Sequence, residues 1–408
     1  MKPMSRSRQL GFSFIELMVS LVLGMMVVGA AVKLFSQGVD ATWVISQRAE
    51  MQQDLRASEN LMLKDISLAG AGLTGVPGES VALPSADGSP IYGCDQTGTA
   101  AGCLPNGPVN YPCIPAGACS PTLYPIMSGY QLGIIPPGAT IPGGGGTDLI
   151  TVVYSDTTLA LSCYTANFTT PGNIMTFTAP ALPLPSSCVL PPGVVYPQAV
   201  NDTVVGLTPG DILLVSTPLG FAVGEVTNVT GPNGVPAPGT VYTVTFSDKD
   251  ALNLNQNGQP NDLTQVSGFL AGVGASVAGS TANRLYVITY YLQTVPDPSG
   301  LTAGTTILYR QVSGHTAAPV ADNVVNLQFT YDTYDSAGTL LSQLGDPTSG
   351  STVAPNVIRK INIAHLTIHS QLAGARSTLV ATQGYQAYDV QTSMSARNLS
   401  YNNRYSFH

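Results

Sequence analysis

The sequence predicts an α+β protein: a long N-terminal, membrane-spanning helix packed on a large β-rich head whose loops are stapled by disulfides. Three observations support this prediction. An apolar run from Leu17 to Val32 opens the chain, all six cysteines follow it, and short β-branched or aromatic runs dominate beyond Thr147. The expected parts are a leader at 1–11, a helix at 12–69 with its membrane span at 12–32, and a head at 70–408.

The first part of the helix is predicted to cross a membrane once. Residues 12–32 contain a single charged side chain, Glu16. As a helix this segment is about 31 Å long, which matches the hydrocarbon core of a bilayer. The basic residues before it and the absence of any acid there place the N-terminus in the cytoplasm. A signal peptide cut near Ala31 is the alternative, but the chain continues into a polar helical pattern without a clear cleavage site.

Beyond the membrane span, the same helix is predicted to continue as an amphipathic stalk. No proline occurs from Lys33 to Leu68, and charged residues recur regularly. Apolar residues at three-, four- and seven-residue steps form one face: Met51, Leu55, Met62, Ile66 and Ala69. Gly70 and Gly72 then end the pattern, as C-terminal caps do. We expect this face to lie against a β-sheet; a membrane-anchored coiled coil is the alternative.

The segment Gly11-Phe12-Ser13-Phe14-Ile15-Glu16-Leu17 resembles the prepilin motif of type IV pilins and type II secretion pseudopilins. In that family a prepilin peptidase cuts after the glycine, and the new amino terminus is methylated. The resemblance implies that Gly11 is the last leader residue, that Phe12 becomes the mature N-terminus, and that Glu16 is the fifth-position glutamate. Ser13 and Phe14 depart from the more usual Thr and Leu. Residues 65–70 also resemble the stalk end of PilW-type minor pilins and of pseudopilin J.

Glu16 is predicted to register one subunit against the next. A carboxylate at mid-bilayer costs about 2.5–3.5 kcal/mol, less near an interface. In a water-free core of packed helices, the free amine of one Phe12 beside a neighbour's Glu16 would largely offset the desolvation of both charges. The alternative is an acid at the membrane interface that reaches water.

The cysteines are predicted to form disulfides in the head. They are Cys94, Cys103, Cys113, Cys119, Cys163 and Cys188. All follow the membrane helix, on the side where an oxidising compartment favours disulfides. Six cysteines permit fifteen pairings; pairing of neighbours along the chain closes the shortest loops and is the pairing expected, with the last two flanking a β-hairpin. Zinc is the alternative, although no Cys-x-x-Cys spacing occurs.

The rest of the head reads as strands separated by loops. Residues 74–146 are rich in Pro and Gly and are expected to be loop-like. Beyond them, β-branched or aromatic runs bounded by Gly, Pro, Asn and Asp predict strands. These runs are 149–154, 211–215, 241–246, 285–292, 306–312, 324–331, 357–368 and 388–395.

The composition of the head predicts no catalysis, no cofactor and no direct nucleic-acid binding. Only 9% of the chain is charged, which suits a secreted β-rich protein. Residues 70–408 hold eight Lys or Arg and seventeen Asp or Glu, so their net charge is about −9, a poor match for DNA. His365 and His369 would lie about 13 Å apart on a strand and cannot share a metal ion. Nucleophile-elbow and P-loop motifs are absent from the sequence.

A loop around Asn253 mimics the start of a calcium-binding EF-hand loop. Asp248, Asp250 and Asp262 are the candidate calcium ligands, but asparagines supply little charge and Thr264 stands where a bidentate glutamate should be. A loop of Asx turns is the simpler interpretation, so no metal site is predicted. The three aspartates are the residues that would bind calcium if the loop did.

Taken with the resemblance, the sequence predicts a non-catalytic minor pilin of the PilW type that primes or caps a type IV pilus. The resemblance implies prepilin peptidase, other minor and major pilins and the inner-membrane assembly platform as partners. It implies a bacterial inner-membrane protein with its N-terminus in the cytoplasm and its head in the periplasm, which later enters the extracellular pilus. The alternatives are a type II secretion pseudopilin of the J kind and, from another class, a membrane-anchored adhesive module.

Overall fold

A computed structural model describes most of the chain. The described residues are 13–73, 80–114, 120–137, 139, 141, 144–169, 173–266, 276–298, 304–334, 339–347, 357–369, 387–396 and 398–399. The chain divides into two compact units, Met1–Gln53 with Ser370–Ala387 and Asp54–His369 with Tyr388–His408. We call the second unit the β-rich body.

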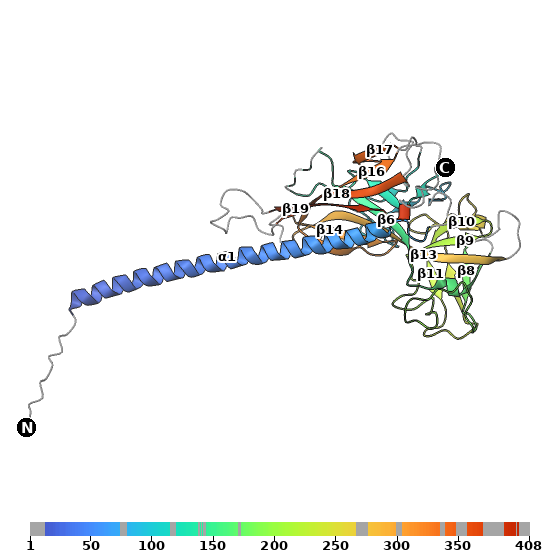
Figure 1. Ribbon diagram of the computed structural model, residues 1–408, viewed down its shortest axis with the longest axis horizontal. Helices are drawn as coiled ribbons and strands as arrows, with labels where there is room; N and C mark the ends of the chain where they lie inside the picture. The colour runs from blue at the N-terminus through green and yellow to red at the C-terminus, as the bar shows by residue number, and fades with distance from the viewer. Residues whose placement is uncertain are drawn as a thin grey trace, which may run out of the picture. The chain divides into compact units, whose positions relative to one another are not determined.

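Helix α1 runs from Phe14 to Leu68 as one unbroken element of 55 residues (Figure 1). The structure thus has the long N-terminal helix that the sequence predicts, while residue 12, where the predicted helix starts, lies outside the described residues. Its most apolar window has a mean hydropathy of 2.3 and is entirely exposed, so by length and composition this helix can cross a membrane. Gly11 and Phe12, the predicted processing residues, lie outside the described part of the chain.

The last part of α1, from Asp54 onward, belongs to the β-rich body, and the predicted apolar face is buried there at Leu55, Met62, Ile66 and Ala69. Met51, which precedes this unit, is buried as well. The helix ends as expected: Gly70 has φ +78°, a left-handed conformation that favours glycine, and its N–H donates to the carbonyl oxygen of Val153 at 2.8 Å. The chain thus leaves the helix by pairing directly with the sheet.

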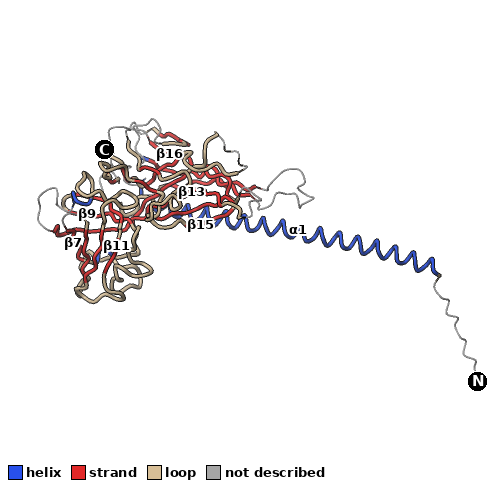
Figure 2. The backbone as a smooth tube through the Cα atoms, turned by 180° about the vertical axis from the view of Figure 1, so that it is seen from behind, coloured by secondary structure: helices blue, strands red, loops and turns tan. Residues whose placement is uncertain are grey.

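The body is built around an eleven-stranded antiparallel sheet with β13 at its centre (Figure 2). β13 is twenty residues long and pairs along its length with β7, β9, β6 and β14. The sheet contains β5 (Ile126–Gly129), β6 (Leu149–Ser155), β7 (Thr165–Thr169), β8 (Ile174–Thr178), β9 (Ile212–Thr217), β10 (Gly220–Glu225), β11 (Asn228–Thr230), β12 (Val241–Thr245), β13 (Ser276–Val295), β14 (Thr305–Val312) and β15 (Ala318–Asp322).

Smaller elements complete the fold. A four-stranded sheet has the order β17-β16-β18-β19, and two short strand pairs, β1 with β4 and β2 with β3, lie in the predicted loop region. Their bounds are β1 Val81–Ala82, β2 Ile91–Tyr92, β3 Val109–Asn110, β4 Thr122–Leu123, β16 Val324–Tyr334, β17 Leu340–Leu344, β18 Ile358–His369 and β19 Ala387–Ser395. The short helices are η2 (Leu161–Cys163) and α2 (Leu263–Val266).

All eight predicted strand segments are strands, but the prediction was too short at the centre of the sheet. β13 begins at Ser276, well before the predicted start at Leu285. The added segment is rich in Ser, Ala and Gly, so it carries little β-propensity, and it is extended because β7 and β9 pair with it. β5, β10, β11, β15 and β17 were not predicted; in β10 glycine occurs at both Gly220 and Gly224.

Among the described residues of the body, two hydrophobic clusters position the sheet and its loops. One joins the loop region to the sheet and includes Leu83, Leu123, Val153 and Leu285. The other fills the lobe formed by β7, β8, β9 and β12 and includes Phe168, Phe177, Tyr242 and Phe246. Edge-to-face ring contacts, such as Phe168 with Phe246 at 5.9 Å between centroids, order this second cluster.

Candidate functional site

Glu16 lies in the first turn of α1, where a negative charge is favoured by the helix dipole. Its side chain is exposed, as are its neighbours along the apolar part of the helix. Among the described residues, no hydrogen bond or salt bridge joins its carboxylate to another side chain. Glu16 is therefore the one charge on a long apolar surface, and it is available to a partner.

A second acid of α1, Asp65, is deeply buried where the helix meets the sheet. Its side chain is on the body-facing side, and the residue is 1% exposed. One carboxylate oxygen, Oδ2, accepts hydrogen bonds from Arg310 Nε at 2.8 Å and from Tyr290 Oη at 2.7 Å. The other, Oδ1, accepts one from Tyr154 Oη at 3.1 Å. These four residues form what we call the Asp65 junction.

Three adjacent strands supply the partners of Asp65. Tyr290 on β13 and Arg310 on β14 lie directly opposite each other in the ladder. Tyr154 on β6 lies opposite Tyr286, four residues from Tyr290 along β13. Because side chains alternate between the faces of a strand, all three partners point to the same face of the sheet. The last turn of α1 is thereby fixed on that face.

The Asp65 junction shifts the pKa values of the three groups that contact Asp65. Burial and the negative charge of Asp65 raise the pKa of Tyr154 and of Tyr290 well above the ordinary value, so both phenols stay protonated donors. Burial alone would lower the pKa of Arg310, but the hydrogen bond and charge of Asp65 raise it. An acid in the last turn of a helix opposes the helix dipole. The charge of Arg310 and the hydroxyl donors of Tyr154 and Tyr290 compensate Asp65 for this unfavourable interaction.

Our sequence analysis did not identify the Asp65 junction, although one signal was present. Asp65 falls between Met62 and Ile66, within the stripe that we predicted to be apolar. A charged residue inside a buried face requires a partner. The partner could not be named from the sequence, because Arg310 is 245 positions away and is one of eight cations in the head.

A second buried ion cluster fixes the centre of the sheet. Arg284 on β13 donates from Nε to Asp156 Oδ2 at 2.9 Å, and its Nη1 lies 3.5 Å from Asp211 Oδ2. His315 Nε2 lies 3.0 Å from the other oxygen of Asp211. These contacts join the segments after β6, before β9 and after β14 to β13. The cluster is fully occupied by internal partners, which indicates a structural role.

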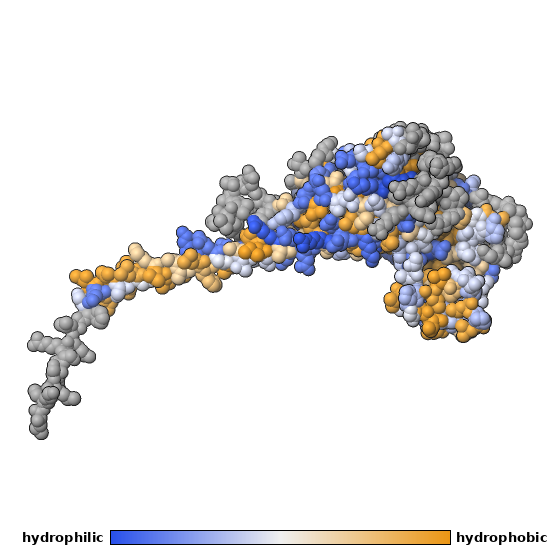
Figure 3. Space-filling view, in the orientation of Figure 1, coloured by the Kyte–Doolittle hydropathy of each residue, from blue (hydrophilic) through white to orange (hydrophobic). Residues whose placement is uncertain are grey.

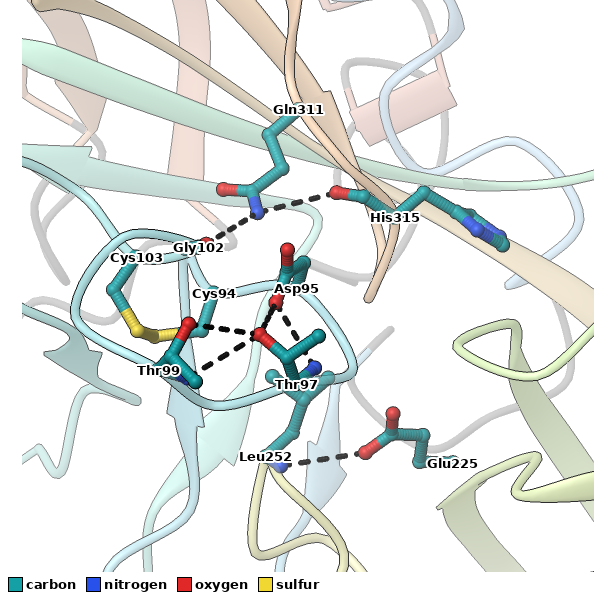
Figure 4. Close-up of a disulfide and its surroundings, with 10 residues drawn as sticks. All are labelled: Cys94, Asp95, Thr97, Thr99, Gly102, Cys103, Glu225, Leu252, Gln311 and His315. Atoms are coloured by element: carbon teal, nitrogen blue, oxygen red, sulfur yellow. Dashed lines mark hydrogen bonds between the residues drawn. A yellow bond between two sulfur atoms is a disulfide. The ribbon is translucent and has the colours of Figure 1, made fainter.

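Two disulfides each join cysteines that are neighbours along the chain, which is the pairing that the sequence favours. Cys94 is bonded to Cys103, and Figure 4 shows the closed loop between them beside β14. Within the loop, Asp95 accepts a hydrogen bond from the backbone N–H of Thr97 at 2.9 Å. Gln311 of β14 donates to the carbonyl oxygen just before Cys103, at 3.5 Å. The loop is thus held to the sheet.

The other cysteines are also in disulfides where the structure describes them. Cys163 is bonded to Cys188, and this bridge brackets the hairpin of β7 and β8, as expected. Cys113 is disulfide-bonded as well. Cys119, its predicted partner, lies outside the described residues.

The three candidate calcium ligands serve as acceptors for the backbone of their own loop. Asp248, Asp250 and Asp262 accept the N–H groups of Asn257, Asn255 and Gln256 at 2.9, 2.6 and 3.3 Å. Asp262 also accepts the N–H of Thr264 at 3.2 Å, which is the Asx-turn spacing that the sequence suggested, whereas the bonds of Asp248 and Asp250 reach nine and five residues along the chain. In the part of the chain that the structure describes, no three His, Cys, Asp or Glu side chains gather as a metal ion would require. That these aspartates form no metal site stays a prediction.

Comparison with known proteins identifies the N-terminal region only. The family model described as the prokaryotic N-terminal methylation motif matches residues 6–32. No curated protein and no solved structure matches the chain. The matched region contains Gly11, Phe12 and Glu16. It supports a type IV pilin-like or pseudopilin subunit, which is a structural rather than an enzymatic class, and with the apolar helix it suggests a membrane anchor.

Proposed function

We propose that this protein is a minor-pilin-like structural subunit of the PilW type, which primes or caps type IV pilus assembly. The observation that supports the proposal most directly is a single unbroken helix, α1. It carries the exposed acid Glu16 at its apolar start and the buried acid Asp65, paired with Arg310, at its other end. Such an element joins an apolar, membrane-competent start of the chain to a bulky β-rich body. The methylation motif at its start supports the same role.

In this proposal Glu16 pairs with a neighbouring subunit after processing. Prepilin peptidase cleaves after Gly11, and Phe12 becomes a methylated N-terminus with a positive charge. When helices pack without water, that amine and a neighbour's Glu16 offset each other's desolvation, whereas either charge alone would be costly. The partners are other minor and major pilins and the inner-membrane assembly platform. The body stands in the periplasm before assembly and outside the cell afterwards.

The size of the body supports a minor rather than a major subunit. Residues 70–408 make up most of the 408-residue chain and form one large sheet with added strands and loops. A head of this size would crowd a filament in which every subunit carried it. A place at the tip or at the start of assembly avoids such crowding.

Processing is the first test of the proposal. We expect co-expression with a prepilin peptidase to yield a chain that begins at N-methylated Phe12, read by mass spectrometry of the intact protein. A Gly11→Val variant should remain uncut, because a β-branched side chain would replace the small leader residue. Ser7→Ala is the matched control and should be cut normally. An uncut wild-type chain, or one cut near Ala31, would contradict the proposal.

The role of Glu16 makes a second prediction. Glu16→Gln keeps the shape of the side chain but removes the charge, so incorporation into filaments should fall about tenfold or more, as expected when a buried amine loses its partner. Asp40→Asn, an exposed acid further along α1, is the matched control and should assemble normally. Immunoblots of sheared filaments measure both. Normal incorporation of the Glu16 variant would show that the acid does not register subunits.

Deleting the gene distinguishes the pilus from the related secretion filament. In our proposal the deletion abolishes surface piliation and twitching motility. Stalled export of secreted enzymes with normal piliation would instead assign the protein to a type II secretion pseudopilus. In both cases the processing and Glu16 results above would stand.

A further inference from the structure

Asp148 is a buried acid without a cationic partner. It directly precedes β6 and is 3% exposed. Among the described residues, no Lys, Arg or His side chain forms an ion pair with its carboxylate. By contrast, the buried acids Asp65 and Asp156 each bind an arginine. A buried charge without an opposite charge is costly, so this position favours the neutral, protonated acid.

The backbone and the side chain of Asp148 join two sheets. Its N–H donates to the carbonyl oxygen of Leu327 on β16 at 2.8 Å, and its Oδ2 accepts the N–H of Phe329 at 2.8 Å. Its Oδ1 accepts the N–H of Gln131, in the turn after β5, at 2.8 Å. Because β16 belongs to the four-stranded sheet and both β5 and β6 belong to the eleven-stranded sheet, this one residue ties the two sheets together.

A second acid, Asp346, lies beside this tie. The antiparallel register of β16 with β17, extended past the end of β17, places Asp346 opposite Phe329, whose N–H Asp148 accepts. The preceding Gly345 lies against the ring of Tyr130, where a Cβ would come within 2.8 Å of a ring carbon. Burial raises the pKa of Asp148 to about 6 although its two N–H donors lower it, and the negative charge of Asp346 adds to the rise.

Two buried hydroxyl groups near Asp148 have no hydrogen-bond partner in the described part of the chain. They are Tyr331 Oη on β16 and Ser128 Oγ on β5, and Tyr331 is 1% exposed. Ser128 is opposite Ile150, two residues from Asp148, so Ser128 and Asp148 lie on one face of the sheet. Burial and then the charge of Asp148 raise the pKa of Tyr331, which stays neutral beside that acid. Both hydroxyl oxygens can accept a hydrogen bond from a protonated Asp148.

The other titratable groups on the elements packed here are phenols. Burial raises the pKa of Tyr92 on β2, so it stays neutral, and the Tyr130 hydroxyl accepts a hydrogen bond from Gln131 Nε2 at 3.0 Å. As pH falls, Asp148 takes up a proton near pH 6 when the two sheets are in contact, but only near its ordinary pKa of 3.8 when it is released into water. Acid therefore favours the contact, and this gain is lost as pH rises through about 6.

We propose that Asp148 is a proton-operated latch between the two sheets, which tightens in mildly acidic surroundings and loosens at neutral pH. At neutral pH the buried charge and Asp346 oppose the contact of β16 with the start of β6. One proton taken up from solvent removes that charge, and the neutral carboxyl oxygens can still accept both N–H groups. The latch is a property of the body alone, so it does not rest on the proposed role in assembly.

Hydrogen exchange of the full chain in detergent micelles, read by mass spectrometry, tests the latch. Peptides that contain Gln131 and Phe329 report it directly, because both amides donate to Asp148. After correction for intrinsic exchange rates, we expect their protection to be about tenfold greater at about pH 5 than at about pH 7.5. Asp148→Asn is neutral at every pH. Its protection is lower overall, because one acceptor is lost, and should change less than about twofold between these pH values.

Asp332→Asn is the matched control, because Asp332 is another acid of β16 that points to the opposite face from Tyr331. Its carboxylate pairs with Lys360 at 3.8 Å. Figure 3 shows mostly hydrophilic side chains over the region where Figure 1 labels β16 and β18, so the outward face of this sheet is polar. The control should keep the full pH dependence of the wild type.

An Asp346→Asn variant supplies a second test that leaves Asp148 in place. Removing the neighbouring charge should move the midpoint of the pH dependence to lower pH. Wild-type protection that is constant with pH, an equal pH dependence in Asp148→Asn, or a midpoint that Asp346→Asn leaves unchanged would each overturn the proposal. Protection that calcium chloride raises at neutral pH in the wild type but not in Asp148→Asn would assign the charge to a metal ion, which overturns it as well.

Discussion

Replacing Asp65 with asparagine should lower the free energy of unfolding of the β-rich body by about 3 kcal/mol. Breaking a buried ion pair by removing one partner costs roughly 3–5 kcal/mol, because the other charge is left without compensation. The lower end applies here, since the Arg310 side chain is 24% exposed and can recover some hydration. Tyr154 and Tyr290 would also lose a charged acceptor.

Unfolding of the full chain in detergent micelles, followed by near-UV circular dichroism of the tyrosines, measures this change. Hydrogen exchange of residues 54–68 should accelerate together with it, because these amides belong to the end of α1 that Asp65 fixes. Glu59→Gln, a half-buried acid on the same helix, is the matched control and should cost little. A loss below about 1 kcal/mol, or one equal to that of the control, would mean that packing alone holds the helix.

A double variant separates the ion pair from the rest of the Asp65 junction. Arg310→Met alone leaves Asp65 buried without its cation. The pair Asp65→Asn with Arg310→Met removes both charges, so it should cost less than the sum of the two single changes. Additive costs would show that the two residues do not act together.

The stability of the body should fall as pH rises from 6 to 8, and Glu225→Gln should abolish that fall. Glu225 ends β10, is 2% exposed, and receives the N–H of Leu252 on Oε2 at 3.3 Å. Burial, with a hydrogen bond to Asp250 and the charge of that acid, raises the pKa of Glu225 to about 9. Glu225 is therefore protonated in the folded protein at neutral pH and donates to Asp250.

The sign follows from proton binding in the two states. Unfolded, Glu225 loses its proton near its ordinary pKa of 4.5, whereas the folded protein retains it up to about 9. Stability from this group is complete below the lower value and is lost as pH rises through the higher one, at up to about 1.4 kcal/mol per pH unit. Glutamine mimics the protonated acid at every pH. The variant should therefore gain roughly 2–3 kcal/mol over the wild type between pH 6 and 8.

Unfolding midpoints in denaturant at pH 6, 7 and 8 test this pH dependence. Asp202→Asn is the matched control, because hydrogen bonds from Val204 and Val205 lower the pKa of Asp202, so that it does not titrate in this range. A constant difference between Glu225→Gln and the wild type across these pH values would show that Glu225 is ionised in the fold. Burial raises the pKa of Asp148 to about 6, so most of its effect on the pH dependence of stability falls below pH 6.

The parts of the fold that the sequence predicted are those that depend on neighbouring residues. The apolar stripe of α1 recurs every three or four positions, and Gly70 ends the helix through its own positive φ. The strands β6, β14 and β18 were recognisable because each is rich in β-branched residues. Cys163 and Cys188 are close in sequence, so the short loop between them favours their pairing.

The parts that could not be predicted depend on residues far apart in the sequence. Whether Asp65 is exposed or buried depends on where β13 and β14 pass, and no local pattern records that. Glu225 gives no signal in the sequence that it will meet Asp250 in the core. The first half of β13 has few strand-forming residues and is extended because other strands pair with it. Long-range pairing therefore overrides local preference at the centre of the sheet.

The central position of β13 has a consequence for biogenesis. Strands β6, β7 and β9 leave the ribosome before β13, the strand that joins them, and Arg310 on β14 follows later still. Until then those earlier strands expose unpaired edges, which are prone to aggregate. The sheet of the body can be completed only after residue 310 has been synthesised, so a chain arrested before that point keeps its unpaired strand edges.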